Sequence, residues 1–496
     1  MSPIYSLAPD LSAQDPQTGR AATTAARDPG RARELILALL LACLLILLFV
    51  AHHRPDRLGQ IQARGVLKIG SEASLVSYLP GHGGFEYELA EAFARDLGVR
   101  LELTTRYPRP KLLQALREGQ VDIAADGLIR HDARAQGVRW GPGYRKVSYQ
   151  LIYRRGRRRP ADLQALGAGP VDTVADPALA GLRAQWAQER PKLGWVVHQD
   201  LDAAELVELV WQDVIDYALV RSDVVALYRR FYPEIRVAFE ASEPHPVAWA
   251  VSAASGSRLA EALDAFFAKI RADGRLAQIR DRYFGHLGAL DYVTIRRFIR
   301  HIYERLPHYR DMIEDTAGQT GLDWRLLAAM AYQESHWDPR AVSPTGVRGL
   351  MMLTRATAAQ LGIADRHDPE GSIQGGARYF RIVKAKLPLR VPEPDRTWLA
   401  LAAYNVGFGH LEDARVLTQR EGGDPDRWID VKRRLPLLRK KRWYRQTKYG
   451  FARGDEPVQY VARIRNFYDI LQWETGAIPG PRPRPPRALD ILPEAL

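Results

Sequence analysis

The chain has 496 residues, of which 46% are hydrophobic and 26% are charged, and its formal net charge is +13. This composition supplies enough apolar material for a packed core and excludes a chain that is disordered throughout. At roughly 150 residues per domain, the length predicts about three folded units. The single cysteine, Cys43, excludes an intramolecular disulfide and a metal site built on cysteines.

The N-terminal part of the sequence divides into a polar tail and an apolar segment. Residues 1–34 are rich in Gly, Ala, Pro and Arg, and we expect them to be disordered. Residues 35–51 contain no charged residue and predict either the core of a signal peptide or a membrane anchor, so that the chain is exported. Residues 40–43 loosely resemble a lipoprotein cleavage site, but the apolar run directly after Cys43 argues against cleavage there.

Strands and helices alternate after this segment. Residues 64–70 and 99–103 are predicted strands, whereas residues 87–94 have the spacing of an amphipathic helix. The alternation predicts an α/β domain with a largely parallel sheet. Residues 155–160 are expected to cross between two lobes of this domain.

Three short segments in this region, residues 119–125, 274–276 and 282–285, resemble the family 3 periplasmic solute-binding proteins. The resemblance covers about residues 60–288. It implies a two-lobed, periplasmic-binding-protein-like α/β fold that closes on a small ligand.

The same resemblance suggests two ligand-binding residues. Arg134 stands where this family grips a ligand carboxylate, and Asp223 stands where it holds an amino group. Ile129 and His131 replace the Thr residues usual before that Arg, so an amino acid and a muropeptide both remain candidate regulatory ligands. Alternatively, Arg134 is a solvated or paired side chain in an Arg-rich chain.

The most informative residue for chemistry is Glu334. Residues 322–335 form a predicted helix capped by Asp323, and Leu327, Met330 and Glu334 lie on one face of it. Burial and the negative end of the helix dipole should favour the protonated carboxyl, which would make it a general acid. In the alternative interpretation, Glu334 pairs with an arginine, Arg340 or Arg348, and is only structural.

Three more sequence blocks follow Glu334-Ser335: Gly349-Leu350-Met351-Met352-Leu353-Thr354, Ala403-Tyr404-Asn405-Val406-Gly407 and Gln459-Tyr460-Val461. In order and spacing they resemble the Slt-type lytic transglycosylases, whose catalytic domain is mostly α and similar to goose-type lysozyme. The resemblance covers about residues 295–475. Met352 stands where a Gln is common in this family. The Met-Met pair resembles that of one branch, the membrane-bound lytic murein transglycosylases F.

This resemblance implies a lyase reaction on peptidoglycan. Glu334 would protonate the glycosidic oxygen between N-acetylmuramic acid and N-acetylglucosamine and then accept the proton of the C6 hydroxyl, leaving a 1,6-anhydromuramoyl end. The loop at residues 350–353 would keep water away from the reacting centre. The implied substrate-binding residues are Ser335, Gly349, Leu350, Met351, Met352, Tyr404, Asn405 and Tyr460.

Other interpretations of the same residues stay open. Tyr404 could be core packing and Asn405 a helix or turn cap. The enzyme could be a hydrolytic muramidase if Asp338 or a distant residue supplied a second carboxylate. The protein could also be a glycan- or solute-binding sensor with an inactive lysozyme-like domain.

The remaining expectations concern partners and location. Lys and Arg cluster at residues 154–159 and 432–448, which favours an anionic wall polymer or lipid headgroups over nucleic acid, or else a plain solvated face. We expect no metal and no cofactor. We expect a periplasmic, membrane-associated protein, peripheral at the outer membrane by resemblance or anchored through residues 35–51. Residues 478–496 are a tail rich in Pro and Arg.

Overall fold

The computed structural model describes residues 40–41, 56–81, 83–107, 109–130, 137–167, 169–343 and 346–478. The chain divides into two compact units, Met1–Pro55 and Asp56–Leu496, and all elements below belong to the second. The predicted tail at 1–34, most of the segment 35–51, Arg134 and nearly all of the C-terminal tail lie outside the described residues. Within the described residues, no helix is long and apolar enough to cross a membrane.

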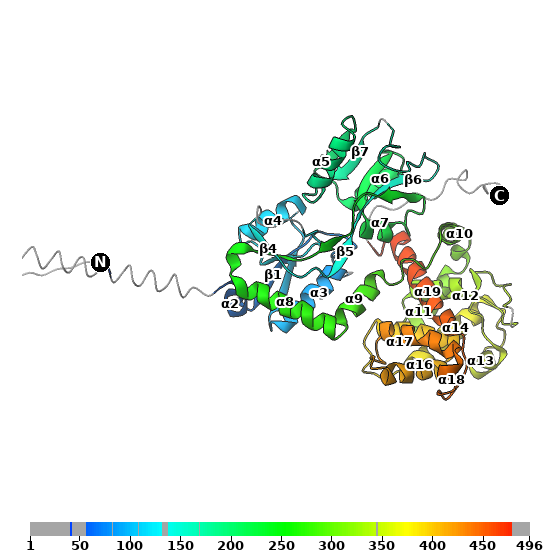
Figure 1. Cartoon of the computed structure of the whole chain (residues 1–496). Coiled ribbons are helices and arrows are strands. Elements are labelled where there is room, and N and C mark those ends of the chain that lie inside the picture. Colours follow the sequence, from blue (N-terminus) through cyan, green and yellow to red (C-terminus); the bar gives the residue numbers. More distant parts are fainter. Residues whose placement is uncertain are drawn as a thin grey trace, which may run out of the picture. The chain divides into compact units, whose positions relative to one another are not determined.

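The first sheet has the strand order β2-β1-β3-β12-β4. Its first three strands are parallel, with Leu67 opposite Leu101 and Ile69 opposite Ile123. The predicted strands and helix of this region are present with slightly shifted ends. The elements are β1 (Val66–Gly70), β2 (Arg100–Thr104), β3 (Ile123–Ala124), β4 (Val138–Trp140) and β12 (Ala250–Ser252), with helices α2 (Arg57–Arg64), α3 (Phe85–Asp96), α4 (Arg109–Arg117), α8 (Ser257–Ala272) and α9 (Arg275–Phe284) (Figure 1).

The second sheet has the order β10-β6-β9-β7-β8. Val207 and Val210 of helix α6 are fully buried and share one hydrophobic cluster with Ala218 and Val220 of strand β9. The elements of this lobe are β6 (Tyr149–Arg154), β7 (Val171–Val174), β8 (Trp195–His198), β9 (Tyr217–Arg221) and β10 (Ile235–Glu240), with helices α5 (Leu179–Glu189), α6 (Ala203–Trp211) and α7 (Ser222–Tyr228).

Two predictions for this α/β region are wrong. Strand β12 is antiparallel to both β3 and β4, and β6 is antiparallel to both β9 and β10, so the sheets are mixed rather than largely parallel. Residues 155–160 follow β6 inside the second lobe, where Arg155 N–H donates to Glu234 O and Arg159 donates to Ala238 O. The chain instead passes between the lobes next to β5 (Arg145–Val147) and β11 (His245–Val247), which pair with each other.

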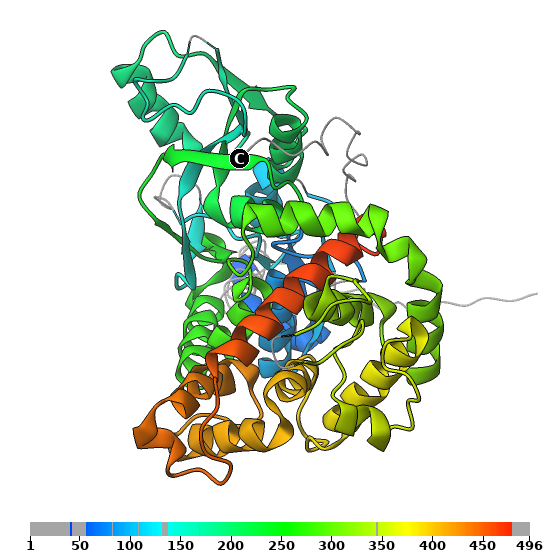
Figure 2. The same ribbon diagram turned by 90° about the vertical axis from the view of Figure 1, so that its right-hand side faces the viewer.

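The C-terminal part of the described chain is helical. In Figure 2 the red helix α19 runs diagonally across this domain, among the yellow, green and orange helices. The α-helices are α10 (Tyr292–Glu304), α11 (Arg310–Thr320), α12 (Trp324–Ser335), α13 (Arg355–Gln360), α14 (Pro369–Ala385), α15 (Asp395–Val406), α16 (Phe408–Arg420), α17 (Trp428–Arg434), α18 (Lys441–Tyr444) and α19 (Asp455–Glu474). Short 3₁₀ segments of this part are η3 (Leu306–His308) and η4 (Leu435–Arg439), whereas η2 (Ala253–Ser255) precedes α8 in the α/β region.

Helix α19 contacts the second lobe as well as the other helices. Trp473 is buried and stacks on Phe231, with ring centroids 4.4 Å apart. Arg230 forms an ion pair with Asp469, and Asn466 donates a 2.6 Å hydrogen bond to His286 O. One continuous hydrophobic cluster therefore includes residues of the second lobe and of the helical domain.

Candidate active site

Helix α12 positions the predicted acid. The Asp323 carboxylate caps its first turn by accepting the Arg325 backbone N–H at 2.8 Å. The helix begins at Trp324, two residues later than predicted, and ends before His336, which has a positive φ of 55°. The residues from 326 to 332 are all buried, so this helix is held by its packing and its end is a fixed point for Glu334.

Glu334 is partly buried and has one hydrogen-bond partner, Tyr460, whose hydroxyl donates to Oε1 at 2.6 Å. Burial raises the pKa of Glu334 from its ordinary 4.5 to about 7, and the hydrogen bond from Tyr460 opposes part of that rise. In the described part of the chain, neither Arg340 nor Arg348 forms an ion pair with it, so the structural pairing weighed above is wrong. The raised pKa agrees with the sequence-based expectation.

Tyr404 lies near the Glu334 carboxyl but forms its hydrogen bond with another group. Its hydroxyl donates to Met351 O at 3.1 Å, and its ring meets Tyr379 edge-on at 5.3 Å between centroids. Burial, and next the charge of Glu334, hold the pKa of Tyr404 well above its usual range. Asn405, the next residue, is exposed at the end of α15. Helices α12, α15 and α19 thus bring Glu334, Tyr404 and Tyr460 together from three parts of the sequence.

The loop after Gly349 packs differently from the prediction. Leu350 and Met351 are fully buried and belong to the hydrophobic core, so their side chains face the protein interior and not a substrate. The expectation that they line a substrate site is corrected to a packing role. Met352 is half-buried with a φ of 48°, and it is the apolar side chain of this loop that reaches the surface.

The packing of the protein backbone requires a glycine at position 349. Its φ is 89°, and a Cβ there would lie 2.1 Å from Arg366 O. The predicted reason, a close approach to the glycan, is therefore replaced by a close approach to backbone. Ser335 is also turned inward, because its buried hydroxyl donates to Ala331 O at 3.1 Å in its own helix.

Two residues that hold this loop were missed by the sequence analysis. The Ser372 hydroxyl accepts the Met351 backbone N–H at 3.0 Å, and Arg366 donates to Leu353 O at 2.8 Å. They fix the loop whose Met351 carbonyl receives the Tyr404 hydroxyl. Neither stands in a motif, and only the fold brings them to the loop.

Comparison with known proteins identifies two regions of the chain. The model of the Transglycosylase SLT domain matches residues 311–426, and that of the bacterial extracellular solute-binding proteins, family 3, matches residues 68–286. A relative from Idiomarina loihiensis, "Membrane-bound lytic murein transglycosylase F", is 46% identical over 449 residues, which cover 90% of this chain and 98% of the relative. The chain belongs to the membrane-bound lytic murein transglycosylase F family.

Other relatives of this transglycosylase agree. One from Pseudomonas putida with the same name is 43% identical, over 87% of this chain and 90% of the relative. Among solved structures, the ancestral amino acid-binding protein AncCDT-1 is 20% identical, with a TM-score of 0.41, and covers 46% of this chain and 100% of its own. The chain is accordingly a lyase that acts on peptidoglycan, with a solute-binding domain before its helical SLT domain.

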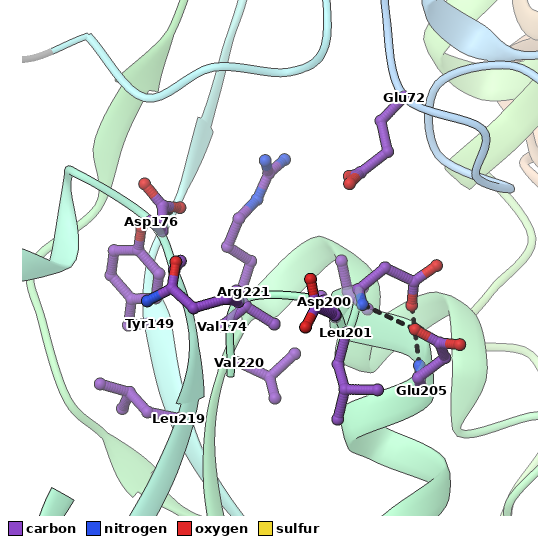
Figure 3. A pocket seen from close by; sticks show the side chains of 15 residues that line it. Glu72, Tyr149, Val174, Asp176, Asp200, Leu201, Glu205, Leu219, Val220 and Arg221 are labelled. Carbon is purple, nitrogen blue, oxygen red and sulfur yellow. Dashed lines mark hydrogen bonds between the residues drawn. The ribbon is translucent and has the colours of Figure 1, made fainter. Parts of the chain in front are cut away.

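The solute-binding region of this transglycosylase contains a cavity of about 410 Å³. Figure 3 shows Glu72, Asp176, Asp200 and Arg221 among the side chains around it. The Arg221 guanidinium is bonded to Gly127 O and to the carboxylate of Asp223. Its charge is therefore matched within the protein.

The predicted amine partner, Asp223, is not available for a ligand in this structure. Its buried carboxylate forms ion pairs with both Arg145 and Arg221. These guanidinium groups hold the pKa of Asp223 below its usual range despite its burial. The expected contact to an amino group is corrected accordingly, because a ligand amine would have to displace two cations.

In the part of the transglycosylase that the structure describes, no group of three or more His, Cys, Asp or Glu side chains is arranged to hold a metal ion. His198 bonds Asp172, and His286 bonds Asp469, which also pairs with Arg230.

Proposed function

We propose that this enzyme cleaves the bond between N-acetylmuramic acid and N-acetylglucosamine without water, and that Glu334 is its only acid and base. The observation that carries the proposal is a single partly buried carboxyl with a pKa of about 7. Among the described residues, Glu334 has no carboxylate partner, whereas two-carboxylate glycosidases place a second one about 5–10 Å away. Asp338 caps a turn by accepting the Arg340 N–H at 2.9 Å.

The reaction balances with this one group. Protonated Glu334 gives its proton to the glycosidic oxygen while the bond from that oxygen to the anomeric carbon breaks. The resulting carboxylate then accepts the proton of the muramoyl C6 hydroxyl as that oxygen bonds to the anomeric carbon. The product is a 1,6-anhydromuramoyl end, and Glu334 is protonated again.

We assign supporting roles by what each side chain contacts. Tyr460 orients the Glu334 carboxyl and stabilises its ionised form through the 2.6 Å hydrogen bond. The proposed substrate contacts are Met352, which is half-buried, and Asn405, which is exposed. Tyr404 and Gly349 act indirectly, because both hold the loop at residues 349–354 in place.

We also propose that the solute-binding domain regulates the enzyme. Helix α19 supports this, since it carries Tyr460 near its beginning and contacts the second lobe further along, through Asp469 and Trp473. Asn466 of the same helix contacts His286, just after α9. A movement of the lobes on ligand binding would be transmitted to Glu334 through helix α19. A small ligand, an amino acid or a muropeptide, is the proposed effector. The enzyme would act in the periplasm, where peptidoglycan lies, in association with a membrane, and the name of its relatives calls them membrane-bound.

Mass spectrometry of the soluble products from purified peptidoglycan tests the reaction. The full chain is compared with Glu334→Gln and with Glu314→Gln, a control at an exposed carboxylate paired with Arg310. We expect anhydromuramoyl products from the parent and the control only. Products with reducing ends would establish hydrolysis. If the parent released no products, a binding protein would be favoured. If Glu334→Gln were as active as the parent, the catalytic role of Glu334 would be refuted.

A further inference from the structure

The segment from 431 to 454 is the most basic part of the chain. It contains ten Lys or Arg residues and no Asp or Glu. It covers the end of α17, the 3₁₀ segment η4, the short helix α18 and the loop before α19. Leu435 and Leu438 are buried, so the segment is anchored in the core while its charged residues face outward.

Five exposed cations of this segment form no ion pair with a described carboxylate. Four other cations form ion pairs: Lys432 with Asp281, Arg433 with Asp430, Arg439 with Asp455 and Arg453 with Glu456. In contrast, five exposed side chains form no ion pair with any described carboxylate, and we call these five the basic patch: Lys440, Lys441, Arg442, Arg445 and Lys448. An uncompensated group of this kind attracts anions from solution.

Two exposed aromatic rings accompany the basic patch. Tyr449 and Phe451 are each 53% exposed, and Phe451 meets Tyr444 edge-on at 5.7 Å between centroids. Large apolar rings are normally buried, so rings exposed beside cations indicate a contact surface. Aromatic faces also suit the apolar faces of sugars and peptide groups.

The end of the basic patch is held against helix α16. The backbone N–H groups of Lys448 and Tyr449 donate to the buried Asp413 carboxylate of α16 at 3.0 and 2.9 Å. The Tyr449 ring covers Gly409, where a Cβ would lie 2.8 Å from it. Helix α16 starts at Phe408, three residues after Asn405, and Figure 1 shows α16, α17 and α18 next to one another.

We propose that the basic patch binds the carboxylate groups of the peptide stems on the peptidoglycan strand that reacts at Glu334. This inference rests on the proposed function, because it assigns a second contact to the same substrate. A polymer that is bound at one place presents its neighbouring groups at high effective concentration, so a second contact raises the overall affinity. The patch is anchored on α16, which begins three residues after Asn405, a proposed substrate contact, and this placement favours the substrate strand over a lipid surface as the partner.

Binding of the full chain to insoluble peptidoglycan tests the proposal. All proteins carry Glu334→Gln, so that the strand is not cleaved during the measurement. The patch variant is Lys440→Gln/Lys441→Gln/Arg442→Gln, and Arg445→Gln/Lys448→Gln is a second, independent variant. The matched control removes three exposed charges from the solute-binding domain, Arg139→Gln/Arg158→Gln/Lys192→Gln, and Lys440→Arg/Lys441→Arg/Arg442→Lys keeps the charge of the patch.

We expect both patch variants to bind at least about fivefold more weakly at low salt, where surface charges act most strongly, and the two control variants to bind like the parent. Peptidoglycan whose carboxylates have been converted to amides should bind the parent and the patch variants equally. Unchanged binding by the patch variants, or a loss seen only with anionic phospholipid vesicles, would overturn the proposal. Binding does not require turnover, so a failure of the lyase reaction would appear separately, in the product analysis.

Discussion

The Tyr460 hydroxyl donates a 2.6 Å hydrogen bond to Oε1 of Glu334, across 126 positions of sequence. The bond joins the first half of α19 to the last turn of α12, so the geometry of the acid depends on how these two helices pack. Because the bond favours the ionised carboxylate while burial favours the protonated one, the two effects together keep the pKa of Glu334 at about 7. A group with this pKa can give and take a proton at neutral pH.

Tyr460→Phe should change both the rate and its pH dependence. Loss of the hydrogen bond raises the pKa of Glu334 further, so the fall of kcat/KM at high pH should move to higher pH. Loss of orientation should lower kcat by roughly tenfold to a hundredfold. The pH–rate profile measures both effects. Tyr468→Phe, which removes a 2.8 Å hydrogen bond to Asp323 from the same helix, should leave the profile in place.

Glu334→Gln should stabilise the protein at alkaline pH while abolishing activity. Below about pH 4.5, the carboxyl is protonated in both folded and unfolded chains and adds nothing to the pH dependence. Between 4.5 and about 7 the unfolded chain loses the proton first, so the free energy of unfolding falls as pH rises. The variant avoids this loss. Its melting temperature relative to the parent should therefore be higher at pH 8 than at pH 5.

The control for this stability effect is Glu314→Gln, at an exposed carboxylate paired with Arg310. Its melting temperature relative to the parent should differ little between pH 5 and pH 8. If Glu334→Gln showed the same small change as this control, the raised pKa of Glu334 would be refuted.

Sequence patterns predicted those helices and strands whose positions depend on neighbouring residues in the chain. The spacing of apolar residues and the Asp323 cap are sufficient to locate α12, and the alternation around residues 66 and 100 located the parallel pair β1 and β2. The antiparallel strand β12 was missed because its partners β3 and β4 lie more than 100 positions earlier in the sequence. Nothing in residues 250–252 themselves encodes that pairing.

The candidate site shows the same limit. An apolar residue in a loop has the same sequence signature whether it faces a substrate or the core, so Leu350 and Met351 could not be separated from Met352 before the fold was known. Asp223 was assigned to a ligand by family resemblance, and the resemblance did not reveal that Arg145, 78 positions away, and Arg221 both pair with it. The burial of Glu334 was predicted correctly because the apolar spacing of its own helix places it on the inward face, whereas its contact with Tyr460 of α19 depends on the fold.

Gly349→Ala should destabilise the helical domain strongly. The residue has a φ of 89°, and the added Cβ would overlap Arg366 O at 2.1 Å. Left-handed backbone and overlap together should cost about 3 kcal/mol. Gly346→Ala is the matched control, since its φ is 76° with nothing within 4 Å, and it should cost about 1–2 kcal/mol. Thermal unfolding followed by circular dichroism compares them, and equal losses would contradict the role of Arg366.

Trp473→Ala should separate the unfolding of the helical domain from that of the solute-binding domain. Trp473 is buried, stacks on Phe231 at 4.4 Å and meets Tyr228 edge-on at 6.0 Å between centroids. Its removal should lower the free energy of unfolding by about 3–5 kcal/mol, because it removes packing between α19 and the second lobe. Differential scanning calorimetry should therefore show two transitions for the variant and one for the parent.

Trp186→Ala is the control, because it removes an equally large buried side chain from a cluster confined to the solute-binding domain. It should lower the unfolding temperature and keep a single transition. A single transition in Trp473→Ala would mean that coupling does not depend on α19, and it would remove the structural support for regulation through that helix.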